Sequence, residues 1–222
     1  MRMFRRSAGV RSCLVAACLF STGLANVALG EPLTGDMDQN ETAVLEELNL
    51  ARTRPSEFAN YVEEHKRNFK GYFFVVLDGR KTTRTFEGLK AVDEAIAFLK
   101  KSEPVPALSA SRPLTLSARD HVKDLGPRGM TGHVGADTSQ PADRISRYGT
   151  PKTLSGEGIT FGSVSARSIV IQLIVDDGVA GRDHRKNVFE PDFRVAGIAI
   201  GPHKTYELMC VIDFADQIVE KR

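Results

Sequence analysis

Hydrophobic positions recur at helical spacing over the first well-patterned stretch of the chain. From Asn40 onward, apolar side chains from Val44 to Ala51 fall on one helical face. Pro55 suits the first turn of a helix that continues this stretch. By the same reasoning, four further helices are predicted at residues 89–99, 111–125, 141–148 and 165–177, with a loop at 126–140.

Two pairs of strands are also predicted. Residues 72–77 and a threonine-rich stretch up to Phe86 flank Asp78-Gly79, which is a typical hairpin turn. Near the C-terminus, residues 195–200 are small and apolar, and residues 206–214 alternate so that one face is buried and Asp213 lies on a solvated face. Because helices alternate with antiparallel hairpins and no parallel crossover pattern is seen, we expect a sheet covered by helices.

Residues 1–30 have the pattern of a secretory signal peptide. Four arginines lie within the first eleven residues, residues 12–30 are uncharged, and Ala28-Leu29-Gly30 provides small residues before Glu31. Cleavage near Gly30 predicts a secreted or periplasmic protein with no membrane span after cleavage. An uncleaved anchor and lipoprotein processing at Cys18 are the two alternatives that the pattern leaves open.

Charge and cysteine content narrow the function classes. Without residues 1–30, the remaining 192 residues carry 26 basic and 28 acidic side chains, so nothing indicates a nucleic-acid partner. Cys210 is the one cysteine outside the leader, so no disulfide is expected within the domain. Residues 31–41 are interpreted as a linker, 42–216 as one domain and 217–222 as a C-terminal tail.

Three segments place polar residues in unusual settings. His133 and Glu157 each lie between or beside glycines, and Asp176-Asp177 ends an apolar helix shortly before His184. Acids at a helix C-terminus oppose the helix dipole, so a nearby His, Arg or metal should compensate them. Imidazoles with carboxylates suit a divalent metal or acid–base chemistry, although no local spacing brings the two histidines together.

The remaining polar candidates have structural interpretations. His121 lies on the apolar face of its predicted helix and is expected to be a hydrogen-bonded core residue. His203 is expected to be solvated, Arg144 to form an ion pair, and Cys210 to lie in a strand core.

Several short motifs, in the correct order between residues 42 and 215, resemble the CAP superfamily, also called the SCP domain. The extracellular bacterial branch is the most similar. The motifs that carry the resemblance are Asn49-Leu50-Ala51-Arg52-Thr53-Arg54-Pro55, Leu116-Ser117-Ala118-Arg119-Asp120-His121, Gly132-His133, Gly156-Glu157-Gly158-Ile159, His184-Arg185-Lys186-Asn187-Val188-Phe189 and Gly197-Ile198-Ala199.

The resemblance implies an α+β fold, a three-layer α-β-α sandwich with a mainly antiparallel sheet flanked by helices. It also implies a cleft that holds His133, Glu157, His184 and a second acid. Asp176 is preferred to Asp177 for that acid, because it follows the family's aromatic position, here Leu173, by three residues. Residues 69–101 are interpreted as an insertion of one subgroup.

The resemblance therefore predicts a secreted CAP-domain protein whose cleft binds a divalent metal, with Zn the expected ion, and an unknown extracellular ligand or cell-envelope component. One alternative is a metal-assisted hydrolase acting on peptide or peptidoglycan, with Glu157 or Asp176 as base. The other is a non-catalytic interaction module. No serine or cysteine is placed by motif beside either histidine, which disfavours acyl-enzyme chemistry. The resemblance implies no settled activity, so whether a reaction is catalysed stays open, and a protein that is not an enzyme is preferred.

Overall fold

The computed structural model describes residues 36–77 and 81–221. The predicted signal peptide, part of the predicted linker and Asp78-Gly79 at the predicted hairpin turn lie outside the described residues. Within the described part of the chain, every helix is too short or too polar to cross a bilayer.

Helices and strands alternate along the chain. In order, the elements are α1 (Gln39–Thr53), α2 (Pro55–His65), a short 3-10 helix (Lys66–Asn68), β1 (Phe69–Lys70), β2 (Phe74–Leu77), β3 (Lys81–Arg84), α3 (Leu89–Lys101), β4 (Ser109–Ala110), α4 (Arg112–Arg128), α5 (Pro141–Tyr148), β5 (Gly149–Pro151), β6 (Ser155–Phe161), α6 (Ala166–Val175), α7 (Asp183–Phe189), β7 (Val195–His203), β8 (Glu207–Ala215) and β9 (Ile218–Glu220).

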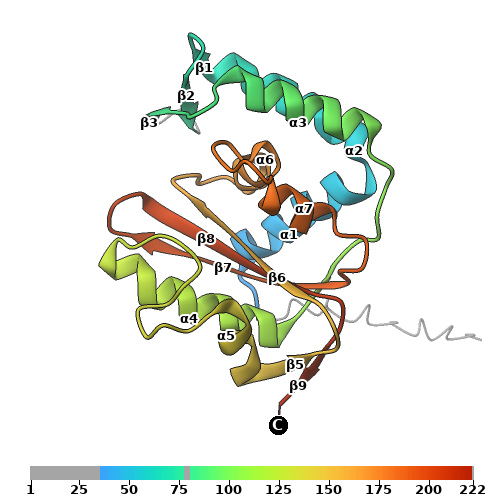
Figure 1. The fold of residues 1–222 in the computed structure, drawn as a ribbon, viewed down its shortest axis with the longest axis vertical. Coiled ribbons are helices and arrows are strands. Elements are labelled where there is room, and N and C mark those ends of the chain that lie inside the picture. The colour runs from blue at the N-terminus through green and yellow to red at the C-terminus, as the bar shows by residue number, and fades with distance from the viewer. Residues whose placement is uncertain (1–35, 78–80, 222) are drawn as a thin grey trace, which may run out of the picture. The chain divides into compact units, whose positions relative to one another are not determined.

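The central sheet has the strand order β4-β7-β8-β6, and its three long strands are antiparallel. Helices α4 and α5 lie on one side of this sheet, and α1, α6 and α7 lie on the other (Figure 1). The larger core cluster joins the second helical layer to the sheet, and a smaller cluster lies under α4. The α+β fold with helices on both faces of the sheet is therefore confirmed.

Strand β8 departs from the sequence prediction. Its alternating pattern predicted one solvated face, but Asp213 is fully buried, as are the residues on either side of it. Strand β8 lies between β7 and β6, and helices cover both faces of the sheet, so from Met209 to Ala215 neither face of this strand reaches solvent. The prediction of a wet face was wrong because alternation cannot reveal a second covering layer.

The segment predicted as an insertion forms its own small layer. Strands β2 and β3 pair as the predicted hairpin, β1 adds a short third strand, and α3 packs on α2. At the C-terminus, β9 pairs with β5 within the segment interpreted as a tail. Helix α4 also includes the first three residues of the predicted loop, 126–128. Gly129 then ends the helix in the left-handed region at φ 69°.

Candidate functional site

Two imidazole rings meet beside β6, which is an edge strand of the central sheet. His133 comes from the loop between α4 and α5, on one side of the sheet, and His184 from the first turn of α7, on the other. Their ring centroids lie 5.8 Å apart, with 37° between the ring planes. Residues 51 positions apart in the sequence thus form one pair of rings, called here the imidazole pair.

Glu157 on β6 holds the first ring. His133 Nδ1 donates to Glu157 Oε1 at 2.8 Å, and Arg144 Nη2 donates to Glu157 Oε2 at 2.6 Å. The Glu157 carboxyl is buried, which opposes its ionisation. The hydrogen bond from His133 and the charge of Arg144 outweigh this burial and lower the pKa of Glu157. Arg144 also donates to the carbonyl of His133 at 3.1 Å, so the histidine is held through both ring and backbone.

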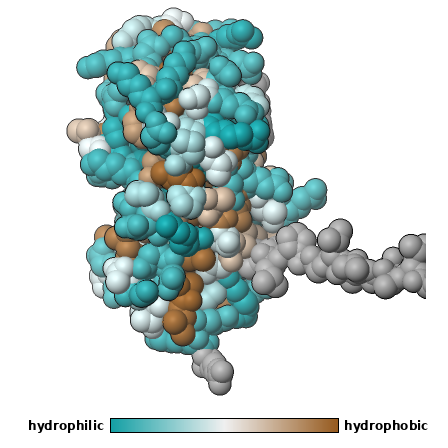
Figure 2. Space-filling model, turned by 90° about the vertical axis from the view of Figure 1, so that its right-hand side faces the viewer, coloured by the Kyte–Doolittle hydropathy of each residue, from teal (hydrophilic) through white to brown (hydrophobic). Residues whose placement is uncertain are grey.

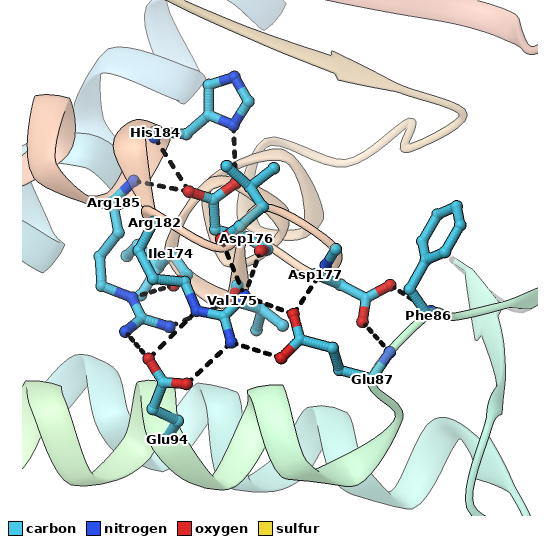
Figure 3. A network of polar contacts seen from close by, with 12 residues as sticks. Phe86, Glu87, Glu94, Ile174, Val175, Asp176, Asp177, Arg182, His184 and Arg185 are labelled. Carbon is cyan, nitrogen blue, oxygen red and sulfur yellow. Dashed lines mark hydrogen bonds and ion pairs between the residues drawn. The ribbon is translucent and has the colours of Figure 1, made fainter.

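Asp176 holds the second ring. It follows the last residue of α6 and adopts the left-handed region at φ 53°. From there Oδ1 accepts from His184 Nδ1 at 2.7 Å, and Oδ2 accepts from the His184 backbone N–H at 3.0 Å (Figure 3). These bonds supply the compensation that an acid at the end of an apolar helix requires.

Asp177 does not take part in the imidazole pair. Its two carboxylate oxygens accept from the backbone N–H groups of Phe86 and Glu87, at 2.7 and 2.8 Å (Figure 3). The side chain therefore faces the insertion rather than His184. Of the two acids proposed from the sequence, Asp176 contacts a site histidine and Asp177 anchors the segment before α3.

An ion-pair cluster, made of Glu87, Glu94, Arg182 and Arg185, fastens the α6–α7 loop to the insertion. Arg182 donates to both oxygens of Glu87, at 2.6 and 2.7 Å, and to both oxygens of Glu94, at 3.1 and 2.8 Å (Figure 3). Arg185 adds a 2.8 Å bond to Glu94. Hydrogen bonds from Arg182 lower the pKa of each glutamate to about 2. The loop that carries His184 is therefore held by the insertion from outside.

The free ring nitrogens determine what the imidazole pair can bind. Both Nδ1 atoms face carboxylates, so each ring is fixed with Nδ1 protonated and Nε2 as a lone-pair donor. The His133 and His184 side chains are 44% and 20% exposed, so a solute can reach them. Among the described residues, no set of three or more His, Cys, Asp or Glu side chains is arranged to hold a metal. The two Nε2 atoms are thus the groups of the imidazole pair that could ligate a metal.

A second buried acid lies beside Glu157 on the neighbouring strand, and its role was not recognised from the sequence. Asp213 on β8 is the cross-strand partner of Glu157, and neither of its oxygens meets a donor with hydrogen-bonding geometry among the described residues. Burial and the charge of Glu157 raise the pKa of Asp213 well above its ordinary value. The register of β6 on β8 is the signal that identifies this pair, and it requires β6 to be recognised as a strand.

Three other predictions concern histidines and an arginine near the site. His121 is fully buried and bonds through Nε2 to the Gly132 carbonyl at 2.9 Å, and Arg144 pairs with Glu157, so both expectations are confirmed. His203 was expected to be solvated but is 2% exposed. Its Nε2 bonds to the Met130 carbonyl at 2.8 Å, and its ring lies 5.1 Å from the Phe161 ring, so it is part of the loop packing.

A cavity of about 340 Å³ adjoins His184 and Asp176. Its walls come from α6, from the end of β6 and from the insertion, and they are mostly apolar. Phe86 and Tyr206 line it and are 79% and 42% exposed. Hydrophobic residues interrupt the otherwise hydrophilic surface in the view of Figure 2, near its middle and toward its lower end. The cavity volume falls within the range of small-molecule sites, about 300–1,000 Å³.

Comparisons with solved structures give two matches. An outer surface protein from Borrelia burgdorferi is 17% identical, with a TM-score of 0.43, and the match covers 50% of this chain and 78% of that one. An extracellular protein containing an SCP domain from Bacillus anthracis is 19% identical, with a TM-score of 0.42, over 58% of this chain and 39% of that one. No curated protein sequence matches this chain.

The family comparison covers most of the chain. The model of the cysteine-rich secretory protein family, CAP, matches residues 45–214. This range begins within α1 and ends within β8, so it includes the imidazole pair and both carboxylates that hold it. The chain therefore belongs to the CAP family of cysteine-rich secretory proteins.

Proposed function

We propose that this chain is a secreted CAP-domain protein that binds a divalent metal ion, Zn²⁺ in the first instance, at the imidazole pair. The observation that carries the proposal is the fixing of both Nδ1 atoms by carboxylates, which leaves two Nε2 donors on rings whose centroids lie 5.8 Å apart. Secretion rests on the signal-peptide pattern of residues 1–30.

The donor set supports an open site rather than a closed structural one. Structural zinc sites have four protein ligands and catalytic ones usually three, whereas this pair offers two. A bound ion would supply Lewis acidity and open coordination positions. The protein's own contribution is to hold the rings in place and to keep the Nε2 lone pairs directed away from the carboxylates.

The geometry favours binding over base catalysis by the two acids. Glu157 accepts from His133 and Arg144, and Asp176 accepts from the ring and the backbone of His184. A carboxylate whose pKa is lowered by such partners, as that of Glu157 is, is a weak base. Both acids therefore act here as positioning residues for the imidazoles.

Zinc titration of the purified protein by calorimetry tests the proposal. Wild type is expected to bind one ion per chain, and His133→Ala and His184→Ala are each expected to abolish the heat, because one imidazole alone holds the ion weakly. Asp176→Asn should weaken binding about 10- to 100-fold, since the residue that orients a ligating ring contributes that much to affinity.

His65→Ala is the matched control, because His65 lies at the end of α2 and outside the imidazole pair. Its titration should reproduce that of wild type. Equal heats in wild type and both imidazole variants would show that zinc binds elsewhere, and the proposed function would then be wrong.

A further inference from the structure

Strand β6 presents a free edge to the cavity. In an antiparallel strand, the N–H and C=O groups of one residue both point to the same side, and the next residue points to the opposite side. Gly162 donates to Leu208 on the β8 side, so the peptide groups of Glu157, Ile159 and Phe161 point away from the sheet. Strand β6 is at the end of the strand order, and within residues 36–77 and 81–221 no further strand pairs with these groups.

Two side-chain amides cap this edge on both sides of Ile159. Asn187 Nδ2 donates to the Glu157 carbonyl at 3.0 Å, and Gln172 Nε2 donates to the Phe161 carbonyl at 3.1 Å. For Ile159 itself, the described part of the chain provides neither a donor to the outward C=O nor an acceptor for the outward N–H. One residue of open strand edge therefore remains between two capped carbonyls.

The same wall carries another unsatisfied polar atom. Gln172 Oε1 is buried and meets no hydrogen-bond partner among the described residues. Gln172, Ile159 and Phe161 all line the cavity that adjoins His184. The lining of the cavity also includes Val75 and Val92 from the insertion and Val175 from α6.

We propose that this cavity binds a short extended peptide, one residue of which pairs its N–H and C=O with those of Ile159 while its apolar side chain packs on the valine walls. Unpaired backbone groups beside an apolar cavity are costly to cover with hydrocarbon, because a hydrocarbon removes their water and supplies no partner. A peptide group supplies both a donor and an acceptor, as strands added to sheet edges do. The capped carbonyls on both sides limit the pairing to a single ligand residue.

The paired residue lies close to the imidazole pair. Ile159 is two residues from Glu157, which corresponds to about 6.6 Å along a strand. Since Glu157 holds His133, and His184 lines the cavity, a peptide on this edge brings its backbone toward the two rings. The inference adds a ligand class to the proposed function, but the pairing with Ile159 does not itself depend on a metal.

Backbone N-methylation of a probe peptide tests the pairing directly. The probe is acetyl-threonyl-valyl-threonine amide, titrated into the protein in the presence of EDTA and followed by the backbone amide signals in NMR. The Ile159 amide is expected to shift as the peptide binds. The same peptide with a methyl group on the valine nitrogen should bind about tenfold more weakly, since it loses one hydrogen bond without losing apolar surface.

Substitutions at the strand edge provide the second arm. Ile159→Pro removes the outward N–H and should weaken binding of the unmodified peptide about tenfold, and an edge strand tolerates proline when its N–H faces outward. Ile159→Val keeps that N–H and should bind as wild type does. If Ile159→Pro does not fold, the N-methylated peptide still decides the question with wild-type protein.

Three results would overturn the inference. The first is no shift of the Ile159 amide at millimolar peptide, and the second is equal affinity for the plain and N-methylated peptides. The third is saturable binding of dodecanoate in the same cavity when neither peptide displaces it. His133→Ala is expected to keep peptide binding while losing zinc. A wild-type protein that binds the peptide but no zinc would thus contradict the proposed function alone, and one that binds zinc but no peptide would contradict the inference alone.

Discussion

At the residue scale, the site contains two acids in different states. Glu157 is ionised and paired, whereas Asp213, its cross-strand neighbour, is fully buried and meets no hydrogen-bond partner in the part of the chain that the structure describes. Two carboxylates that share a buried site cannot both ionise easily, so the charge of one holds the proton on the other. The opposite pKa shifts of Glu157 and Asp213 follow from this arrangement.

Asp213→Asn is expected to make the free energy of unfolding less dependent on pH. The raised pKa means that folded Asp213 keeps its proton after the unfolded chain has lost it, above about pH 4. The unfolded state then binds fewer protons, so wild-type stability falls as pH rises, by up to about 1.4 kcal/mol per pH unit until the folded pKa is reached. Asparagine has no proton to lose, and urea unfolding from pH 4 to 8 should show the variant gaining stability relative to wild type.

Asp216→Asn is the control with the opposite sign. Hydrogen bonds from Thr153 and from neighbouring backbone N–H groups lower the pKa of Asp216 despite its desolvation. Its contribution to stability is complete above about pH 4 and is lost as the pH falls further, so the deficit of this variant relative to wild type should be constant from pH 4 to 8 and shrink below pH 4. A constant difference between Asp213→Asn and wild type at all pH values would contradict the assignment.

The site histidines show how far residue-level prediction reached. Spacing alone could not bring His133 and His184 together, and the family resemblance placed them at one cleft. The structure brings the two rings to 5.8 Å. The assignment of Asp176 over Asp177 depended on counting from Leu173, and the hydrogen bond to His184 agrees with it. Asp213 was missed because its role depends on a cross-strand register, which no local pattern contains.

At the element scale, the insertion acts as a brace for the α6–α7 loop. Arg182 is in the left-handed region at φ 51° and lies between Glu87, before α3, and Glu94, on α3. Its side chain is 12% exposed, while those of the glutamates are 28% and 44% exposed. The loop that carries His184 thus depends on residues that lie about 90 positions earlier in the chain.

Arg182→Lys is expected to loosen this brace. A lysine cannot form the forked bonds that the guanidinium makes to two carboxylates, so the variant should lose about 1–2 kcal/mol of stability at neutral pH, an estimate reduced for the partial exposure of the glutamates. Because the glutamates have pKa values of about 2, the stabilisation is complete above about pH 4.3 and disappears toward pH 2. Thermal unfolding at pH 7 and pH 3 should show a smaller difference from wild type at the lower pH.

Arg128→Lys tests whether any surface arginine would behave in this way. Arg128 pairs with Asp124 on α4, and its side chain is 59% exposed. Such exposed pairs contribute about 0–1 kcal/mol, so this variant should unfold within about 0.5 kcal/mol of wild type at both pH values. An Arg182→Lys variant that does the same would show that the cluster is not a brace.

Long periodic helices were predictable as elements, and strands β4, β5 and β6 were not. The helices α1, α3, α5 and α6 begin and end within a few residues of their predicted bounds, since each carries a helical repeat of apolar positions. Strand β6 was read as a glycine-flanked carboxylate rather than a strand, because Gly156 and Gly158 interrupt its apolar face. Strands β4 and β5 are two and three residues long, which is too short for a pattern to form.

At the scale of the whole molecule, the opening motif of the domain ties distant segments together. Asn49 exchanges two hydrogen bonds with the backbone of Leu108, at 2.9 and 2.7 Å, immediately before β4. Arg52, fully buried, donates to four backbone carbonyl oxygens, those of Pro106, Val188, Glu190 and Phe193. The motif that indicated the family is thus a structural junction between α1, the segment after α3 and the connection from α7 to β7.

Arg52→Lys is expected to destabilise the whole fold by about 2–4 kcal/mol. Burial lowers the pKa of Arg52 to about 10, so the side chain is still charged at neutral pH. The four carbonyl oxygens stabilise this buried charge. A lysine ammonium can reach only part of the ring of carbonyls, and each buried carbonyl left without a donor costs about 1–3 kcal/mol. Urea unfolding should show a lower midpoint with an unchanged slope, because the loss is in the folded state.

Arg54→Lys is the control, because the Arg54 side chain is 62% exposed beside Glu57. This variant should leave the urea midpoint near that of wild type. Equal midpoints for the Arg52 and Arg54 variants would mean that Arg52 does not join these segments.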